Sequence, residues 1–222
     1  MYKSHKRSVQ KTAHYYTLGT ASSDTKYFWI VCHGYGQLAS RFIQQFQLLD
    51  SEKHFVLAPE GFHRFYWQGF SGDVVASWMT KADRLDDIKD YTSYLQGLYE
   101  EYLTMLPQNV KIVLFGFSQG CATVCRWMNA FQPKFDKLVL WGGALPEDID
   151  YQPLLPYFSL KEIIFAYGTS DQFLTVENRI EKHISFAKAN KLEMAIWPFE
   201  GKHETRKAVV KQFSKEVIEN EI

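Results

Sequence analysis

The sequence predicts an α/β fold, a doubly wound and mostly parallel sheet of about seven or eight strands covered by helices. Short runs of β-type residues alternate along the chain with segments of helical periodicity, which is the pattern of such a sheet. The alternation continues over the 222 residues without a repeat, a linker or a low-complexity tract. We therefore expect a single domain that spans residues 1–222.

The chain opens with two β-rich runs and continues as helix and strand. A turn-forming cluster separates Ser8–Leu18 from Tyr27–Cys32, so we expect these runs to form an antiparallel N-terminal pair. Gln37–Asp50 carries apolar residues at helical spacing and predicts a helix. His54–Ala58 is a short apolar run that ends at Pro59 and predicts the next strand of a parallel sheet.

A long helix is predicted between Asp83 and Pro107. Asp83 is suited to cap its N-terminus, and Asp86 and Asp87 in the first turn favour the positive end of the helix dipole. The apolar residues expected along its buried face are Leu85, Ile88, Leu95, Leu98 and Tyr102.

The second half of the chain repeats strand and helix. The predicted strands are Lys111–Phe115, Lys137–Trp141, Glu162–Tyr167 and Glu193–Phe199. The predicted helices are Cys121–Met128, Val176–Asn190 and His203–Glu219. In sheets of this kind the chemistry lies at the carboxyl ends of the strands, so the residues that follow each strand are the candidates for a functional site.

The charge balance argues for a small-molecule substrate. Lys plus Arg and Asp plus Glu both count 25, so no general basic surface for nucleic acid or an anionic membrane is expected. No apolar run approaches the ~18 residues of a membrane span, and the polar, basic N-terminus has no signal-peptide core. We expect a cytoplasmic protein that is a monomer or a homodimer.

The three cysteines, Cys32, Cys121 and Cys125, follow neither a disulfide nor a zinc-binding pattern. Their number is odd, and none of them forms a Cys-x-x-Cys motif. We expect buried thiols that pack as small hydrophobic side chains. Neither a metal nor a cofactor is expected.

A serine, an acid and a histidine occupy three predicted strand ends in that order. Gly116–Gly120 reads Gly-Phe-Ser-Gln-Gly between a strand and a helix, and a serine between glycines at such a turn is typical of a nucleophile elbow. Asp171 follows the predicted strand Glu162–Tyr167, and His203 follows the last predicted strand, Glu193–Phe199. His203 can take the proton of Ser118 near neutral pH, and Asp171 can orient and stabilise the imidazole.

Acyl transfer by a serine also needs two preset donors for the negative oxygen of the tetrahedral intermediate. The glycine-containing loop His33–Gly36 follows the strand Tyr27–Cys32 and leads into a helix. We expect the backbone N–H groups of Tyr35 and Gln119 to be these donors. His33 is expected to support the loop from below.

These motifs resemble the phospholipase/carboxylesterase family of α/β-hydrolases, which includes acyl-protein thioesterases and small bacterial carboxylesterases. The resemblance covers the chain from about Tyr27 to Phe213 and implies the α/β-hydrolase fold, with Ser118, Asp171 and His203 as its catalytic triad. The motifs that carry it are Cys32-His33-Gly34-Tyr35-Gly36, Gly116-Phe117-Ser118-Gln119-Gly120, Gly168-Thr169-Ser170-Asp171 and Gly201-Lys202-His203.

Two positions depart from this family pattern. Gln37 stands where the family often has Asp, which leaves open how the oxyanion loop is anchored. Cys121 stands where the family often has a further Gly, and this exchange should only crowd the elbow.

Other residues compete for the acid and base roles. Asp148 and Asp150 lie in a proline-containing loop, where capping or solvated positions suit them better than the role of Asp171. His183 lies within a predicted helix without a following turn, and we expect it to be a core or surface residue.

Substrate specificity is expected from two long connections. Gly61–Thr80 is rich in aromatic residues and predicts an apolar wall or partial lid over the serine, although Phe62 and Trp78 fit packing onto the sheet equally well. Ala144–Leu160 is expected to form the opposite wall. The residues expected to bind substrate are Phe65, Tyr66, Trp67, Phe70 and Leu145.

The sequence therefore predicts a serine hydrolase that cleaves carboxylic esters of small or medium acyl chains through an acyl-enzyme. A thioesterase or lysophospholipase with the same triad is the nearest alternative, and its small-molecule substrate would be a thioester or a lipid ester. A serine peptidase is a weaker alternative. A non-catalytic binding protein of the same fold is the alternative of another class, and the intact serine, acid and histidine argue against it.

Overall fold

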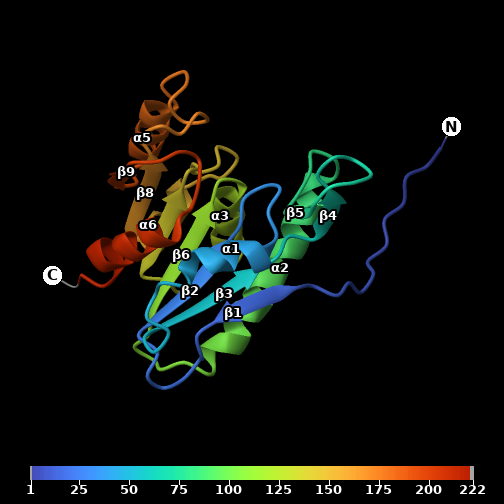
Figure 1. Ribbon diagram of the computed structural model, residues 1–222. Helices are drawn as coiled ribbons and strands as arrows, with labels where there is room; N and C mark the ends of the chain where they lie inside the picture. Colours follow the sequence, from blue (N-terminus) through green and yellow to red (C-terminus); the bar gives the residue numbers. More distant parts are fainter. Residues whose placement is uncertain (1, 221–222) are drawn as a thin grey trace.

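A seven-stranded sheet in the order β1-β3-β2-β6-β7-β8-β9 forms the centre of the structure, a computed structural model that describes residues 2–220 (Figure 1). The outermost residues of the expected domain, 1 and 221–222, lie outside this range. The strands are β1 (Tyr15–Leu18), β2 (Tyr27–Cys32), β3 (His54–Pro59), β6 (Lys111–Phe117), β7 (Lys137–Trp141), β8 (Glu162–Gly168) and β9 (Ala195–Phe199). The predicted α/β class and the mostly parallel sheet are confirmed.

The antiparallel pair at the N-terminus is present, but its predicted partner is wrong. β1 pairs antiparallel with β3, in a register that places Tyr15 opposite Pro59, whereas β2 pairs parallel with both β3 and β6. Every residue of β2 is buried, so this strand belongs inside the sheet with a neighbour on each side. β1 alternates exposed and half-buried residues, which suits an edge.

Helices cover both faces of the sheet (Figure 1). α2 (Arg84–Leu103) and α3 (Gln119–Phe131) pack with Phe28 and Ile30 of β2 in one hydrophobic cluster. On the other face, α1 (Ala39–Phe42), the 3-10 helix Ile43–Phe46 and α6 (Lys207–Phe213) pack with the alternate residues of the same strand. The two-residue period of β2 therefore divides its side chains between two cores.

The remaining helices are α4 (Leu155–Phe158), which follows the 3-10 turn Gln152–Leu154, α5 (Arg179–Ala189), and a π-helical turn, Ser214–Ile218, after α6. The predicted helix His203–Glu219 thus begins only at Lys207. His203 lies in the connection between β9 and α6, where its side chain is not constrained by a helix.

The long helix α2 begins differently from its prediction. Asp83 has a left-handed backbone (φ 50°) and its side chain caps no helical N–H group, because the carboxylate lies 2.8 Å from the Lys6 ammonium. Leu85 is 74% exposed, since the helix contacts the hydrophobic core only from Ile88 onward.

The long connection Gly61–Thr80 contains a β-hairpin, which the sequence does not predict. β4 (His63–Tyr66) and β5 (Val74–Ser77) form a separate two-stranded antiparallel sheet beside the main one (Figure 1). Trp78, directly after β5, is fully buried and therefore packs the base of the hairpin onto the core.

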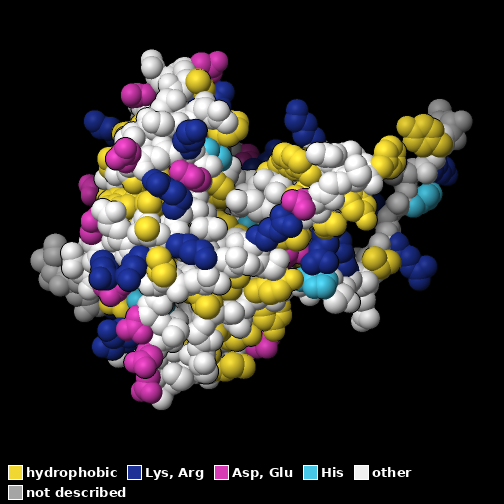
Figure 2. Space-filling model, viewed as in Figure 1, with side chains coloured by type: hydrophobic (Ala, Val, Ile, Leu, Met, Phe, Trp, Pro, Cys, Tyr) yellow, Lys and Arg dark blue, Asp and Glu magenta, His cyan; other side chains and the backbone are white. Residues whose placement is uncertain are grey.

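The surface agrees with the balanced composition. Figure 2 shows basic and acidic side chains interspersed over the visible face. Among residues 2–220, no helix combines the length and apolarity that crossing a membrane requires.

Candidate active site

Ser118 lies at a sharp turn between β6 and α3 and has a positive φ of 53°. Its N–H donates to the Trp141 carbonyl oxygen at 2.9 Å. The two flanking glycines are needed for close packing, because a Cβ at Gly120 would collide with the carbonyl oxygen of Cys32 and one at Gly116 would lie 2.5 Å from Cys121 Cα. The structure thus contains the strand, strained turn and helix of a nucleophile elbow.

Asp171 and His203 meet across two neighbouring loops. His203 Nδ1 lies 2.7 Å from Asp171 Oδ2, and the second carboxylate oxygen accepts the N–H of Phe173 at 2.8 Å. The loops are joined by the bond from Ser170 N–H to the Gly201 carbonyl oxygen at 2.9 Å. Since a carboxylate only accepts, Nδ1 carries the proton and Nε2 is left free to act as a base.

Aromatic rings hold the imidazole of His203. Its ring centre lies 4.9 Å from that of Phe117 and 4.7 Å from that of Phe173, the latter edge to face. Gly142 has φ 61°, and a Cβ there would lie 3.2 Å from His203 Cε1. The ring is thus confined on several sides with its orientation set by Asp171.

Ser118 and His203 line the same cavity of about 690 Å³. Within residues 2–220, the Ser118 hydroxyl makes no hydrogen bond. Such contacts are often long in the absence of substrate. The structure therefore places Ser118 and His203 at one cavity, with Asp171 buried behind the ring of His203 and in contact with it.

The predicted oxyanion loop is anchored by the residue that departs from the family pattern. Gln37 Oε1 accepts the N–H of Gly34 at 2.9 Å. The backbone N–H of Tyr35 has no acceptor among the described residues, and that of Gln119 belongs to the first turn of α3, where helical N–H groups lack partners. Both predicted donors are therefore available.

His33 supports this loop, as expected. Its ring is fully buried, and Nε2 accepts the N–H of Gly61 at 3.0 Å while Nδ1 lies 2.8 Å from the Gly34 carbonyl oxygen. Nδ1 therefore carries the proton. Burial lowers the pKa of His33 to about 4, so the ring is neutral at pH 7.

The predicted substrate residues have different positions. Trp67 lines the cavity of Ser118, and Phe65 packs on the Tyr35 ring at 5.5 Å between centroids. Tyr66 and Phe70 are exposed, Phe70 completely. Leu145 is only 4% exposed and belongs to the hydrophobic core, because the connection Ala144–Leu160 packs inward.

Several cavity residues were not singled out from the sequence. Phe173 and Leu174 are further apolar residues that line the cavity, besides Trp67. Phe173 lies two residues after Asp171, at the same strand end, and this position is the feature of the sequence that could identify it as a cavity residue. The polar residues that line the cavity besides Ser118 and His203 include Glu147, Arg179, Lys182 and His183.

His183 was expected to be a core or surface residue, and its side chain is half-buried. It packs edge to face on Phe165, with ring centres 5.8 Å apart, and also lines the cavity. Burial lowers the pKa of its imidazole, which favours the neutral ring at pH 7.

The competing acids have structural roles. Asp148 forms ion pairs with Arg84 at 2.6 Å and Arg126 at 3.0 Å. Asp150 Oδ1 accepts the N–H of Gln152 at the start of the 3-10 turn. Neither carboxylate contacts His203, whereas Asp171 lies 2.7 Å from its ring, so Asp171 is the acid that the geometry favours.

All three cysteines are buried and free, as the sequence predicts. The Cys121 thiol donates to the Gly116 carbonyl oxygen at 3.0 Å. A Cβ at Gly143 would lie 2.7 Å from the Cys121 sulfur, so this side chain fills space that a glycine vacates. Burial raises the pKa of Cys125 to about 12, and the neutral thiols behave as core residues.

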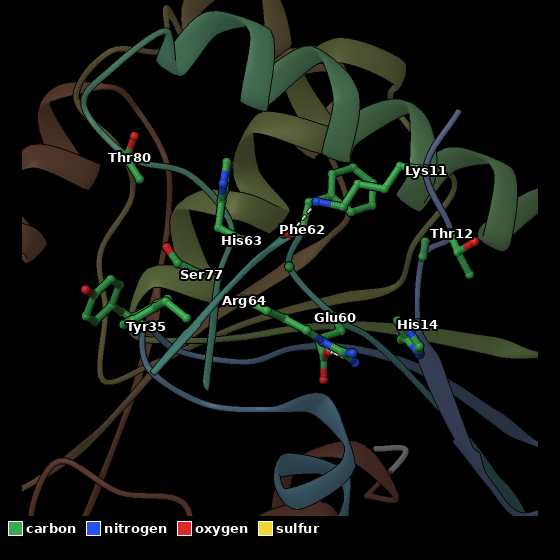
Figure 3. Close-up of a pocket in the computed structure, with 13 residues that line it drawn as sticks. Lys11, Thr12, His14, Tyr35, Glu60, Phe62, His63, Arg64, Ser77 and Thr80 are labelled. Atoms are coloured by element: carbon green, nitrogen blue, oxygen red, sulfur yellow. Dashed lines mark hydrogen bonds and ion pairs between the residues drawn. The ribbon is translucent and has the colours of Figure 1, made fainter. Parts of the chain in front are cut away.

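A second cavity of about 670 Å³ lies beside the hairpin and shares Tyr35 with the first (Figure 3). The charged side chains Lys11, Glu60 and Arg64 in its lining already have hydrogen-bond partners. Glu60 accepts from Arg64 Nε at 2.7 Å and from Ala39 N–H at 3.0 Å, and Lys11 Nζ donates to the Phe62 carbonyl oxygen. Since neither Ser118 nor His203 lines this cavity, the first one is the candidate active site.

No group of three or more His, Cys, Asp or Glu side chains within residues 2–220 is arranged to hold a metal ion. A reaction without metal or cofactor therefore stays a prediction from the sequence.

Solved structures with this fold include three related enzymes. Zea mays acyl-protein thioesterase 2 has a TM-score of 0.71 at 15% identity, covering 93% of this chain and 98% of that one. A Bacillus cereus carboxylesterase has a TM-score of 0.63 at 14% identity, and the match covers 91% of this chain and 92% of that one. A Mesorhizobium loti carboxylesterase has a TM-score of 0.66 at 14% identity, and the match covers 92% of this chain and 95% of that one. At such low identities these similarities show the fold.

The family itself is shown by sequence. No curated protein sequence matches this chain significantly. The model of the phospholipase/carboxylesterase family, however, matches residues 20–218, which is most of the chain. The resemblance noted from the motifs is thereby confirmed, and the chain belongs to the phospholipase/carboxylesterase family of α/β-hydrolases.

Proposed function

We propose that this protein is a serine hydrolase that cleaves carboxylic esters of small or medium acyl chains through an acyl-enzyme. The observation that carries the proposal is the 2.7 Å contact between Asp171 and His203 at the cavity that Ser118 lines. Membership of a carboxylesterase family supports the reaction type.

In the proposed mechanism His203 Nε2 takes the hydroxyl proton of Ser118 while the serine oxygen attacks the ester carbonyl carbon. The carbonyl oxygen becomes negative and accepts hydrogen bonds from the N–H groups of Tyr35 and Gln119. The intermediate collapses to the acyl-enzyme, and His203 returns the proton to the departing alkoxide. Water then repeats these steps, and the acid leaves.

Asp171 would stabilise the imidazolium that forms in each half of the reaction. Its carboxylate is buried, and besides His203 it accepts the backbone N–H of Phe173. A buried carboxylate with such partners keeps one orientation, which holds the ring in the productive tautomer.

The substrate range is inferred from the cavity. Trp67, Phe173 and Leu174 offer apolar contact close to Ser118, and the volume of about 690 Å³ fits a small or medium acyl group. Phe65, Tyr66 and Phe70 remain candidates for contact with larger substrates at the hairpin.

Thioester hydrolysis is the second candidate, because a chain similar in fold is an acyl-protein thioesterase. Serine, histidine and oxyanion donors would serve a thioester in the same way. Rates over nitrophenyl esters of rising chain length, measured beside the matching thioesters, separate the two activities.

We also propose that residues 1–222 act as one domain, in the cytoplasm, as a monomer or a homodimer. The burial of three free thiols supports a reducing compartment. The match to the family model over residues 20–218 supports one catalytic unit.

Labelling with a fluorophosphonate separates a hydrolase from a binding protein. We expect one adduct on the wild type and none on Ser118→Ala, because the reagent requires an activated serine. Ser185→Ala, an exposed position on α5, is the matched control and should label like the wild type. Equal labelling of wild type and Ser118→Ala would contradict the proposed nucleophile.

A further inference from the structure

Both predicted oxyanion donors are connected to one segment, Ala76–Met79, which we call the hairpin stem. Gly36, directly after Tyr35, donates its N–H to the Ala76 carbonyl oxygen at 2.9 Å. Gln119 reaches the stem through its side chain. None of the stem residues lines the cavity of Ser118, so the stem can affect the reaction only through the groups it holds.

The carboxamide of Gln119 bridges to the stem in one defined orientation. The Trp78 N–H can only donate, so the amide atom 3.2 Å from it must be the oxygen, Oε1. Nε2 then donates to Ser77 Oγ at 3.2 Å, and the Ser77 hydroxyl donates to the Met79 carbonyl oxygen at 3.0 Å. Each polar group in the bridge has a partner of the right kind.

The bridge lies where lost hydrogen bonds are costly. Ser77 is 1% exposed and Trp78 is fully buried, so water cannot replace a missing amide. Gln119 is also the first residue of α3. Its side chain, fixed at the far end, therefore restricts the backbone N–H that is predicted to face the substrate oxygen.

The other donor is held from the same stem by backbone bonds. Ala76 donates its N–H to the Gln37 carbonyl oxygen at 3.2 Å, which completes a short antiparallel bridge with the bond from Gly36. Gly36 has φ 74°, and a Cβ there would lie 2.5 Å from the Trp67 ring. The loop that carries Tyr35 therefore lies directly against the hairpin.

We propose that Gln119 is a positioning residue, whose carboxamide fixes its own backbone N–H relative to that of Tyr35 with the hairpin stem as common support. The inference rests on the proposed hydrolase function. Oxyanion donors act on charge that develops in the transition state, so the bridge should affect kcat and leave KM nearly unchanged.

Gln119→Met tests the bridge, because it keeps the length of the side chain and removes both amide bonds. We expect kcat for a short nitrophenyl ester to fall about tenfold with KM within about twofold, since a displaced donor loses part of its effect. Affinity for an alkylboronic acid, which forms a tetrahedral adduct on serine, should fall by the same factor. Affinity for the carboxylic acid product should stay unchanged.

Gln96→Met is the matched control. Gln96, on α2, accepts the indole N–H of the buried Trp127 through Oε1 at 2.9 Å. Trp127 lies on α3 about two turns beyond Gln119. This variant loses a comparable amide bond away from the cavity, so we expect lower thermal stability with kcat and boronate affinity within about twofold of wild type. Ser77→Ala removes only one arm of the bridge and should lower kcat about threefold.

Rates are normalised to the sites that a fluorophosphonate labels, so misfolded protein does not contribute. Wild-type kcat and boronate affinity in folded Gln119→Met would overturn the proposal, as would an equal loss in Gln96→Met. If Gln119→Met does not fold, Ser77→Ala decides in the same way. A wild type that hydrolyses no ester and takes no label is a distinct result, which overturns the hydrolase function together with this inference.

Discussion

The strand ends of the sheet and the β4–β5 hairpin both reach the cavity, but they are held differently. At the strand ends, neighbouring loops are joined by backbone bonds, such as Ser170 N–H to Gly201 at 2.9 Å, and Asp171 is fully buried. The hairpin is tied at its stem, while its tip carries Phe70 fully exposed and Trp67 at 56% exposure. Groups assigned to the chemistry thus lie in segments fixed on several sides, and substrate contact is assigned to a segment whose tip is largely exposed and is joined to α1 by the Arg41–Asp73 ion pair.

Asp171→Asn tests the strand-end half of this comparison and should have the largest effect. An amide in place of the carboxylate favours the wrong tautomer of His203, so we expect kcat to fall by about 10³–10⁴-fold. Asp150→Asn, at a solvated turn, is the control and should keep wild-type kcat. Steady-state rates on a nitrophenyl ester measure both, and a loss under tenfold for Asp171→Asn would contradict its assigned role.

His33 links the two regions, because its ring in the oxyanion loop accepts the N–H of Gly61 at the root of the hairpin. Its pKa in the folded protein is about 4, below the ordinary value of 6.5. Between these values the unfolded chain binds a proton that the folded protein does not, so stability falls as pH drops from 6.5 to 4. The loss should be about 3 kcal/mol.

Urea unfolding at pH 7 and pH 4.5 measures this effect. His33→Asn, which cannot be protonated in this range, should show a smaller loss of unfolding free energy between the two pH values. The same pH dependence in wild type and His33→Asn would show that other groups, such as the buried His54, account for it.

Trp67→Ala and Phe70→Ala compare two positions within the hairpin tip. Trp67 lines the cavity and Phe70 does not, so we expect kcat/KM for longer acyl esters to fall about tenfold in Trp67→Ala and less than twofold in Phe70→Ala. A chain-length series on both variants measures this. Equal losses would mean that the whole tip closes over the substrate.

The fold could be predicted because buried parallel strands leave a clear pattern of short apolar runs between helices. The partner of β1 could not be predicted, since the alternation of apolar and polar residues identifies which face of a strand is buried and not which strand lies beside it. β4 reads His-Arg-Phe-Tyr, a short run without apolar alternation, so the hairpin looked like a loop.

The sequence could nominate candidate residues where one residue type is required at a strand end, and the structure places two of them, Ser118 and His203, at one cavity, with Asp171 in contact with His203. The cavity walls were less predictable, because composition does not distinguish an apolar residue that lines a cavity from one that fills the core. Leu145 was expected at the wall and is buried in the core, whereas Phe173 was overlooked and lines the cavity.

The buried thiols have a practical consequence for work on the hairpin. Alkylating reagents react with an exposed thiolate, and burial raises the pKa values of Cys32, Cys121 and Cys125 above the ordinary range. A Phe70→Cys variant would therefore carry one readily reactive thiol, at the fully exposed tip of the hairpin. A spin label or fluorophore placed there reports the position of the tip during turnover without removal of any native cysteine.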